Sequence, residues 1–216
     1  MAHILVIGAS AGIGLATVGR ALDKGHAVRA FARQAHRIAR HDAKLDKRTG
    51  DALSAHDVTA ALTGVDAVVL VLGASAYLAP TTLFSRATRI LVDAMTVAAA
   101  TGGTRRLIVV TGLGAGDSRG IGPLAYTHLL FPLVLKRIYD DKDVQEQMIR
   151  ASTLDWTIVR PGILTNGPAT DSYRALPERA DWRGGSVSRA DVAAYLVRLV
   201  ETGEMTGRTP LLLGPG

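Results

Sequence analysis

Short apolar runs alternate with segments of helical periodicity along nearly the whole chain. The runs that predict buried strands lie at 3–7, 27–32, 67–72, 107–110 and 156–159. The segment after the first run carries Leu15, Val18 and Leu22 on one helical face and ends at Gly25. Strands that alternate with helices are typical of a parallel sheet covered on both faces. The pattern therefore predicts the α/β class, as a Rossmann-type doubly wound parallel sheet with helices on both faces.

Serine residues mark the starts of two helices. Ser54 precedes Asp57 by three residues, and Ser188 precedes Asp191 by the same spacing, as a helix N-cap precedes the third helical position. A further helix is predicted at 141–151. These positions fall between the apolar runs, so they agree with the alternating order of strands and helices.

The C-terminal part of the chain holds more irregular sequence. The apolar residues 211–213 are predicted to form an edge strand. We find neither an internal repeat nor a flexible linker, so we expect one domain over residues 1–216. Loops at about 112–137 and 163–187 follow predicted strand ends, where ligands bind in open α/β sheets. We expect these two loops to lie on the substrate side.

Composition narrows the class of protein. Hydrophobic residues make up 48% of the chain, enough for a sizeable core, and there is no cysteine. Disulfides and thiolate chemistry are therefore excluded, and we expect a cytoplasmic protein. No signal-peptide pattern precedes the first strand, and the apolar stretch 129–135 is short and contains Pro132, so no membrane partner is expected. For the oligomeric state we expect a monomer or a weak homodimer.

Positive charge is concentrated near the N-terminus. The formal net charge is +6, and between Arg29 and Arg48 seven basic residues stand against two aspartates. One interpretation is a solvated helix face, and another is a docking place for a cofactor phosphate. A nucleic-acid surface needs interleaved aromatic residues, and this segment has only Phe31, so no nucleic-acid partner is expected. The histidines are scattered without the spacing of metal ligands, so no metal site is expected either.

The first apolar run leads directly into a glycine-rich turn, GASAGIG at 8–14. Glycine lets the backbone turn tightly and approach a bulky anion. The amides at the start of the following helix carry partial positive charge, which favours a pyrophosphate. A strand before the glycines and an amphipathic helix after them form the arrangement that binds dinucleotides. The residues expected to contact the cofactor here are Gly8, Ser10, Ala11, Gly12, Ile13 and Gly14.

Arg33 follows the second predicted strand, where dinucleotide folds contact the adenosine ribose. An NAD site needs an acidic residue there for the ribose 2′-hydroxyl, whereas an NADP site needs arginine for the 2′-phosphate. No Asp or Glu occurs from Val28 to His41. The charge pattern therefore favours NADP(H) over NAD(H), with Arg33 as a contact. For Arg37 and Arg40, a solvated helix face remains an equal alternative.

Several motifs are spread over nearly the whole chain. They are GASAGIG at 8–14, GD at 50–51, GVDAVV at 64–69, VVTG at 109–112, YDDKDVQEQMIRASTLDWTIVRPGILTNGP at 139–168 and SRADVA at 188–193. Together they resemble the short-chain dehydrogenase/reductase superfamily, in its atypical NAD(P)-binding branch of NmrA-like and flavin reductase-like proteins. The resemblance implies a Rossmann fold and a nicotinamide dinucleotide cofactor.

The resemblance also assigns expected contacts on the adenosine side. Asp51, with Ala52 beside it, is expected to accept a hydrogen bond from the adenine amino group, although Asp51 equally suits a turn at a strand end. The segment that passes the adenosine ribose is expected to be Leu72, Gly73 and Ala74, because Gly73 lets the backbone come close.

On the nicotinamide side, Lys142 is expected to hold the ribose hydroxyls, or else to form a surface pair with an acidic neighbour. Thr111 is expected to orient substrate or nicotinamide, or else only to cap a strand. The segment expected to flank the nicotinamide, with backbone groups free to bind its amide, consists of Pro161, Gly162, Ile163 and Leu164.

The proton donor departs from the superfamily pattern. Ketone-reducing members place a tyrosine four residues before the lysine, whereas here Ile138 holds that place and Tyr139 lies three residues before Lys142. Residues three apart share a helical face, so Tyr139 and Lys142 can still meet. The candidate catalytic residues are therefore Thr111, Tyr139 and Lys142, with Tyr139 open between an active-site hydroxyl and a packed ring.

These features together predict an NADPH-dependent oxidoreductase acting on a small-molecule substrate. Without a tyrosine in register, an electron-poor acceptor such as a flavin, a quinone or a similar carbonyl compound fits better than a simple ketone, because it needs less protonation by the enzyme. One alternative is a non-catalytic NADP(H)-binding redox sensor that signals through a partner. An epimerase is the less favoured alternative.

Overall fold

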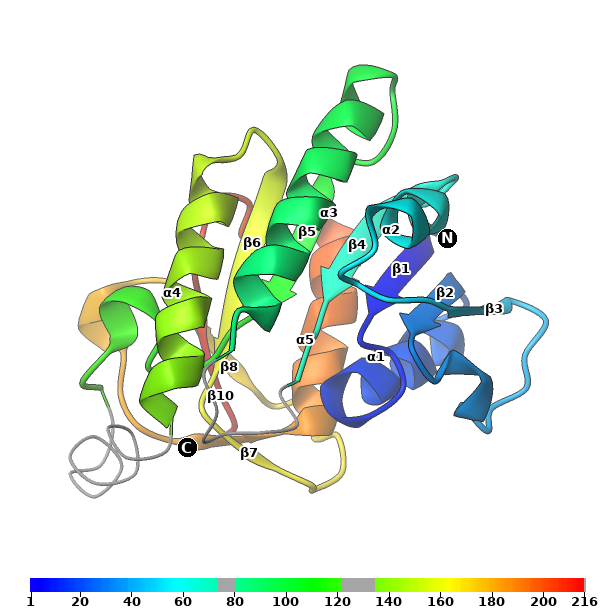
Figure 1. Ribbon diagram of the computed structural model, residues 1–216. Coiled ribbons are helices and arrows are strands. Elements are labelled where there is room, and N and C mark those ends of the chain that lie inside the picture. Colours follow the sequence, from blue (N-terminus) through cyan, green and yellow to red (C-terminus); the bar gives the residue numbers. More distant parts are fainter. Residues whose placement is uncertain (74–80, 122–134, 216) are drawn as a thin grey trace.

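The computed structural model describes residues 1–73, 81–121 and 135–215, and it confirms the predicted Rossmann-type α/β fold (Figure 1). Within those residues an eight-stranded sheet has the order β3-β2-β1-β4-β5-β6-β10-β8, and only β10 and β8 pair antiparallel. The strand order reverses between β1 and β4, which is where open α/β sheets bind ligands. The strands are β1 (His3–Ile7), β2 (Ala27–Ala32), β3 (Leu45–Thr49), β4 (Ala67–Leu70), β5 (Arg106–Val110), β6 (Asp155–Pro161), β8 (Arg174–Leu176) and β10 (Leu211–Leu213).

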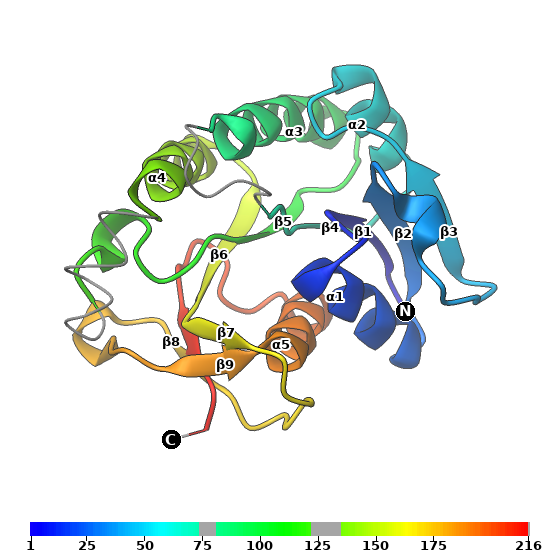
Figure 2. The same cartoon turned by 60° about the horizontal axis from the view of Figure 1, so that its bottom comes forward.

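Helices cover both faces of the sheet, as Figure 2 shows from one end. On one face α1 (Gly12–Asp23) packs beside α5 (Arg189–Thr202). On the other face α3 (Leu83–Ala100) lies between its two packing neighbours, α2 (Ala55–Leu62) and α4 (Lys136–Ala151). Serine caps two of these helices as predicted, because the Ser54 hydroxyl accepts from the Asp57 amide and the Ser188 hydroxyl accepts from the Asp191 amide.

The central strand β1 divides its side chains between two hydrophobic clusters. Ile4 and Val6 pack with residues of α1 and α5, whereas Leu5 and Ile7 pack with residues of α2, α3 and α4. Successive strand residues point to opposite faces of a sheet, so a strand covered on both sides must be apolar throughout. This explains why the continuous apolar run at the N-terminus becomes a central strand.

The structure corrects three details of the prediction. Residues 211–213 form β10, which is not an edge strand, because β8 pairs along its outer side. Helix α4 begins at Lys136 rather than near 141. The loop expected at 163–187 contains β8 and a two-stranded sheet of β7 (Ile163–Thr165) and β9 (Ser186–Ser188). Short 3₁₀ helices lie at Ala35–Arg37, Gly116–Ser118 and Arg179–Asp181.

Two parts of the predicted site lie outside the described residues. They are Ala74 and residues 122–134 of the loop expected at 112–137. None of the described helices is both long and apolar enough to cross a membrane.

Candidate functional site

The three glycines that follow β1, at positions 8, 12 and 14, are present for different structural reasons. Gly8 has φ +92°, and a Cβ there would lie 2.2 Å from the Val71 carbonyl oxygen. A Cβ on Gly14 would lie 2.1 Å from the Gly8 carbonyl oxygen. Both positions therefore need glycine because backbone segments approach each other closely. Gly12, with φ +54°, is instead exposed, and the nearest described atom to a Cβ placed on it is the Arg189 Nε, at 4.0 Å, so its backbone is accessible to a ligand.

The N-terminus of α1 carries no protein cap. Its N-cap residue Ala11 makes no side-chain hydrogen bond, and the first turn contains no acidic residue. Ser10, Ala11 and Gly12 are exposed. The first amides of a helix have no partner within the helix, and the helix dipole makes them attractive to anions. In α2 and α5 a serine side chain meets this need, so the start of α1 is left available for a phosphate group.

Arg33 lies directly after β2, beside the glycine turn. The Gly8 and Ala9 amides both donate to the Phe31 carbonyl oxygen, which joins the end of β2 to this turn. The Arg33 side chain is exposed and makes no hydrogen bond or ion pair with the described residues. Its guanidinium is therefore free to meet an anionic ligand.

The other two arginines considered from the sequence, Arg37 and Arg40, each have a hydrogen-bond partner among the described residues. Arg37 donates to the Gln34 side chain at 3.3 Å. Arg40 pairs with Asp23 at 2.7 Å and with Asp42 at 3.5 Å, and these carboxylates raise the pKa of its guanidinium. Of these three arginines, Arg33 is the one without a hydrogen-bond or ion-pair partner among the described residues.

On the adenosine side the expected residues border the same edge. One carboxylate oxygen of Asp51 accepts from the Leu53 amide at 3.0 Å, so the turn role considered from the sequence is present, with the second oxygen still available. Ala52 and Leu72 are half-buried against the cluster formed with α2 and α3. Gly73 is exposed, and no atom lies within 4 Å of a Cβ placed on it.

Thr111, Tyr139 and Lys142 come together where β5 ends. The Lys142 ammonium donates to the Thr111 carbonyl oxygen and lies 5.0 Å from the Phe84 ring centroid and 5.3 Å from that of Tyr139. The Tyr139 hydroxyl lies over Gly112, where a Cβ would be 2.6 Å from it. The spacing of three residues therefore brings tyrosine and lysine to one face.

Ile138, which holds the superfamily's tyrosine position, is instead buried, 3% exposed. Burial lowers the pKa of Lys142 to about 8, and the nearby Glu146 carboxylate opposes that shift. A lysine with such a pKa exchanges protons near neutral pH.

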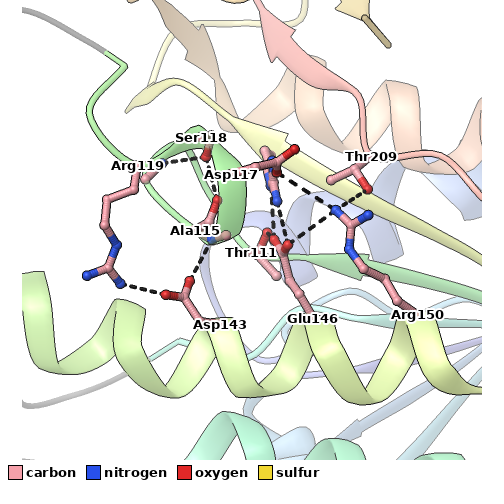
Figure 3. A network of polar contacts seen from close by, with 12 residues as sticks. Thr111, Ala115, Asp117, Ser118, Arg119, Asp143, Glu146, Arg150 and Thr209 are labelled. Carbon is pink, nitrogen blue, oxygen red and sulfur yellow. Dashed lines mark hydrogen bonds and ion pairs between the residues drawn. The ribbon is translucent and has the colours of Figure 1, made fainter. Parts of the chain in front are cut away.

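Beneath this group lies a buried ion pair that sequence reasoning missed. The Arg160 side chain is fully buried and binds both carboxylate oxygens of Glu146, at 3.0 and 2.5 Å. The Thr111 hydroxyl donates to the same carboxylate at 2.8 Å. Arg160 also reaches Asp117 at 2.6 Å, and it holds the pKa of that carboxyl down against the effect of burial. Figure 3 shows Thr111, Asp117 and Arg150 gathered around Glu146.

A second set of contacts ties the segment after β5 to α4. The Gly116 amide donates to Asp143 at 2.6 Å, and Arg119 pairs with Asp143 at 2.6 Å (Figure 3). Arg119 also pairs with Asp140 at 3.0 Å. The polar side chains of α4 therefore fix the described start of the loop expected at 112–137. A usable signal for this network was Arg160, directly after the apolar run 156–159 that becomes part of β6, because a buried arginine requires a carboxylate partner.

The segment from Pro161 to Leu164 differs from expectation in its backbone. The Pro161 carbonyl accepts from Leu113, the Gly162 amide donates to Leu212, and the Ile163 amide donates to Gly185. These three groups are used within the fold, so the prediction that they are free to bind an amide was wrong. Leu164 is half-buried, whereas the Ile163 side chain is 49% exposed. Ile163 is thus the apolar surface that this segment offers to a ligand.

Comparison with known proteins identifies the family. A family profile described as NAD(P)H-binding matches residues 8–202. The chain belongs to this NAD(P)H-binding family. The match confirms the resemblance inferred from the motifs, and it runs from the glycine turn to the end of α5.

Named relatives of this family member include reductases and an epimerase. The chain is 28% identical to the "Uncharacterized sugar epimerase YhfK" of Bacillus subtilis, over 90% of this chain and 86% of the relative. It is 28% identical to the anaerobilin reductase ChuY of Escherichia coli O157:H7, with a TM-score of 0.79 and coverage of 99% and 97%. A short-chain dehydrogenase/reductase of Veillonella parvula in complex with NADP has a TM-score of 0.83 at 18% identity, with coverage of 100% and 95%, and shows a shared fold.

The residues at the glycine turn fit the cofactor of this family. The exposed backbone of Gly12 leaves room for a pyrophosphate, and the uncapped amides of α1 provide its hydrogen-bond donors. Arg33 provides a cation at the end of β2 that has no partner among the described residues. These groups lie at the carboxyl ends of β1 and β2, beside the switch point of the sheet.

Proposed function

We propose that this protein is an NADPH-dependent reductase that transfers hydride to a small electron-poor acceptor such as a flavin, a quinone or a similar carbonyl compound. The observation that carries the proposal is the uncapped N-terminus of α1 next to the free guanidinium of Arg33. The two groups supply donors for a pyrophosphate and a cation for a 2′-phosphate. Bound NADPH supplies the hydride, and the chain supplies binding and orientation.

The proposed cofactor contacts follow the edge of the sheet. The Ser10–Gly14 amides bind the pyrophosphate, Arg33 binds the 2′-phosphate, and Asp51 with Ala52 borders the adenine. Leu72 and Gly73 pass the adenosine ribose, and Lys142 binds the hydroxyls of the nicotinamide ribose. The side chains that border the nicotinamide are those of Ile163 and Leu164, on the segment that begins with Pro161 and Gly162.

The hydrogen bonds around Lys142 favour the kind of acceptor that we propose. The Lys142 ammonium donates a hydrogen bond to the Thr111 carbonyl oxygen, and the Thr111 hydroxyl donates one to the Glu146 carboxylate. Thr111 therefore acts as a positioning residue, and Tyr139 is the candidate proton donor. An electron-poor acceptor needs little acid assistance, which suits this arrangement. ChuY, a related reductase, supports a reductase at the level of reaction type.

A redox sensor without catalysis is the second candidate. The same two hydrogen bonds favour it, because they engage the Lys142 ammonium and the Thr111 hydroxyl within the fold and away from a substrate. Turnover separates the two functions: steady NADPH oxidation with an acceptor supports the reductase, whereas tight NADP binding without turnover supports the sensor.

The test begins with cofactor titrations. Wild-type protein is titrated with NADPH and NADH, alongside Arg33→Asp and the matched control Arg37→Asp from the same segment. A charge-assisted contact to phosphate contributes about 1.5–3 kcal/mol, so Arg33→Asp should weaken NADPH binding roughly ten- to a hundredfold and NADH binding far less. The Arg37 variant should stay near wild type. A wild-type preference for NADH would refute the charge argument.

The second step is an acceptor panel with NADPH as donor. Flavins, quinones and anaerobilin test the reductase, and nucleotide sugars test the epimerase that the name of YhfK suggests. Epimerised sugar without net NADPH oxidation would overturn the reductase in favour of the epimerase.

A further inference from the structure

Arg189, the first residue of α5, faces the glycine turn. The nearest heavy atom to a Cβ placed on Gly12 is the Arg189 Nε, at 4.0 Å. Figure 2 shows α5 lying beside α1, so the starts of both helices border the same space. Arg189 thus places a cation across from the uncapped amides of α1.

The bonds of Arg189 leave half of its guanidinium unused. One nitrogen, Nη1, makes both hydrogen bonds, to the Asn166 side-chain oxygen at 2.6 Å and to the Thr165 carbonyl at 3.3 Å. Nε and Nη2 have no partner among the described residues, and Nε is the atom that faces Gly12. The edge formed by Nε and one terminal nitrogen is the fork with which arginine binds phosphate oxygens.

The stability of α5 does not explain an arginine at this place. A cation in the first turn of a helix is unfavourable because it lies at the positive end of the helix dipole. The cap of α5 is made by other residues, with Ser188 accepting from the Asp191 amide. Both partners of Arg189 are neutral, so its charge is not balanced by a carboxylate within the described part of the chain.

We propose that Arg189 binds the pyrophosphate of the dinucleotide through its Nε–Nη2 edge, from the side opposite the α1 amides. This inference rests on the proposed function, because it names a further contact of the same cofactor site. Asn166 and Thr165 hold Nη1 and so aim the free edge at Gly12. Arg189 is then a binding residue, and Asn166 is a positioning residue that acts through it.

The first turn of α5 also binds the C-terminal end of the segment 165–171, whose N-terminal residues Thr165 and Asn166 are the partners of Arg189. The Thr170 and Asp171 amides donate to the Asp191 carboxylate at 2.7 and 2.9 Å, and these bonds hold its pKa down against burial. Residues 165–171 are thus attached to α5 at both ends. This attachment fixes Asn166 relative to the glycine turn before a cofactor binds, which reduces the entropy lost when the phosphate contact forms.

The experiment compares two arginines of one helix with two ligands. Arg189→Ala is the test variant, and Arg198→Ala is the control, because Arg198 pairs with Glu204 near the other end of α5. NADP⁺ carries the pyrophosphate, whereas 2′-AMP carries only the 2′-phosphate. Arg189→Ala should weaken NADP⁺ binding about ten- to a hundredfold and change 2′-AMP binding less than about twofold, because only the former ligand reaches the fork. Arg198→Ala should change neither.

The outcomes separate this inference from the proposed function. Wild-type protein that binds neither ligand refutes the proposed function itself. Wild-type binding with equal NADP⁺ affinity in the Arg189 and Arg198 variants overturns the role of Arg189, and so does an equal loss for both ligands. If Arg189→Ala does not fold, Arg189→Gln replaces it, since glutamine keeps a donor for Asn166 without the charge and should lose NADP⁺ affinity in the same way.

Discussion

Replacing Lys142 by methionine is expected to stabilise the protein without cofactor while damaging the site. Lys142 is half-buried, with its ammonium 5.0 Å from the Phe84 ring centroid and 5.3 Å from that of Tyr139, and burial lowers its pKa from 10.5 to about 8. A buried ammonium therefore costs stability whenever it is protonated. Methionine keeps a long unbranched side chain for the same space and removes the charge.

The magnitude follows from the pKa of Lys142. Each pKa unit corresponds to about 1.4 kcal/mol, so the fall from 10.5 to about 8 sets an upper limit of about 3.5 kcal/mol. The hydrogen bond to the Thr111 carbonyl and the two ring contacts return part of this cost and are lost in the variant. We therefore expect Lys142→Met to gain about 1–2 kcal/mol at pH 7.

The gain must also depend on pH in one direction. Between pH 8 and pH 10.5 the folded protein binds fewer protons at this lysine than the unfolded chain does, so wild-type stability rises with pH across that window. The advantage of Lys142→Met is therefore complete below pH 8 and disappears toward pH 10.5.

Urea unfolding of the cofactor-free proteins at pH 7 and pH 10 measures both effects. The matched control is Lys136→Met on the same helix, since Lys136 is exposed and pairs with Asp140 at the surface, where such pairs contribute little. A Lys142 variant no more stable than wild type at pH 7 would refute the reasoning, and so would a gain that persists undiminished at pH 10. Weaker NADPH binding by the same variant would show that the stability lost by keeping a lysine at position 142 serves cofactor binding.

Three further experiments test the remaining parts of the site. Gly12→Val should abolish NADPH binding but keep a cooperative unfolding transition, whereas Gly14→Val should fail to fold because its Cβ would lie 2.1 Å from the Gly8 carbonyl oxygen; calorimetry and cofactor titration distinguish them. Tyr139→Phe should slow single-turnover hydride transfer to a flavin or quinone less than tenfold, because an electron-poor acceptor needs little acid assistance from Tyr139. A loss of about 10²–10⁴-fold, the contribution of a general acid, would instead restore ketone reduction. Glu146→Gln should cost about 3 kcal/mol in urea unfolding by leaving Arg160 short of its main counterion, while Glu178→Gln at an exposed pair should be near neutral.

The fold was predictable because its strongest signals are local. A strand buried on both faces must be apolar throughout, so β1 and β4 were visible as runs, and the caps at Ser54 and Ser188 depend on residues within one turn. The position of β10 was not predictable in this way. Its outer neighbour β8 is three half-buried residues inside a polar segment, and their pairing depends on contacts between distant parts of the chain.

The local geometry of the candidate site was predictable where a glycine or a charge has one strong reason to be present, while the cofactor contacts themselves stay predictions. The glycine turn and the free Arg33 belong to this class, because backbone approach and phosphate charge leave few alternatives. Roles that depend on side-chain direction were less accessible. Thr111 could not be assigned from the sequence, since its hydroxyl is directed to Glu146, which lies 35 positions later. The backbone groups at Gly162 and Ile163 were misjudged because their partners lie in β10 and next to β9.

The placement of charge distinguishes the polar residues that are paired within the fold from those proposed to bind the cofactor. Arg160 is fully buried and contacts two carboxylate oxygens of Glu146 and one of Asp117. A charge removed from water needs such counterions. Arg33 and Arg189 lie on either side of the glycine turn, and neither has a carboxylate partner within the described residues. An exposed cation near an uncapped helix start lowers the free energy of a bound phosphate and does little for the fold alone. If both arginines bind the cofactor, Arg33→Ala and Arg189→Ala should weaken NADP⁺ binding additively, because a 2′-phosphate and a pyrophosphate are separate contacts. A double variant no weaker than the poorer single variant would mean that the two side chains share one phosphate.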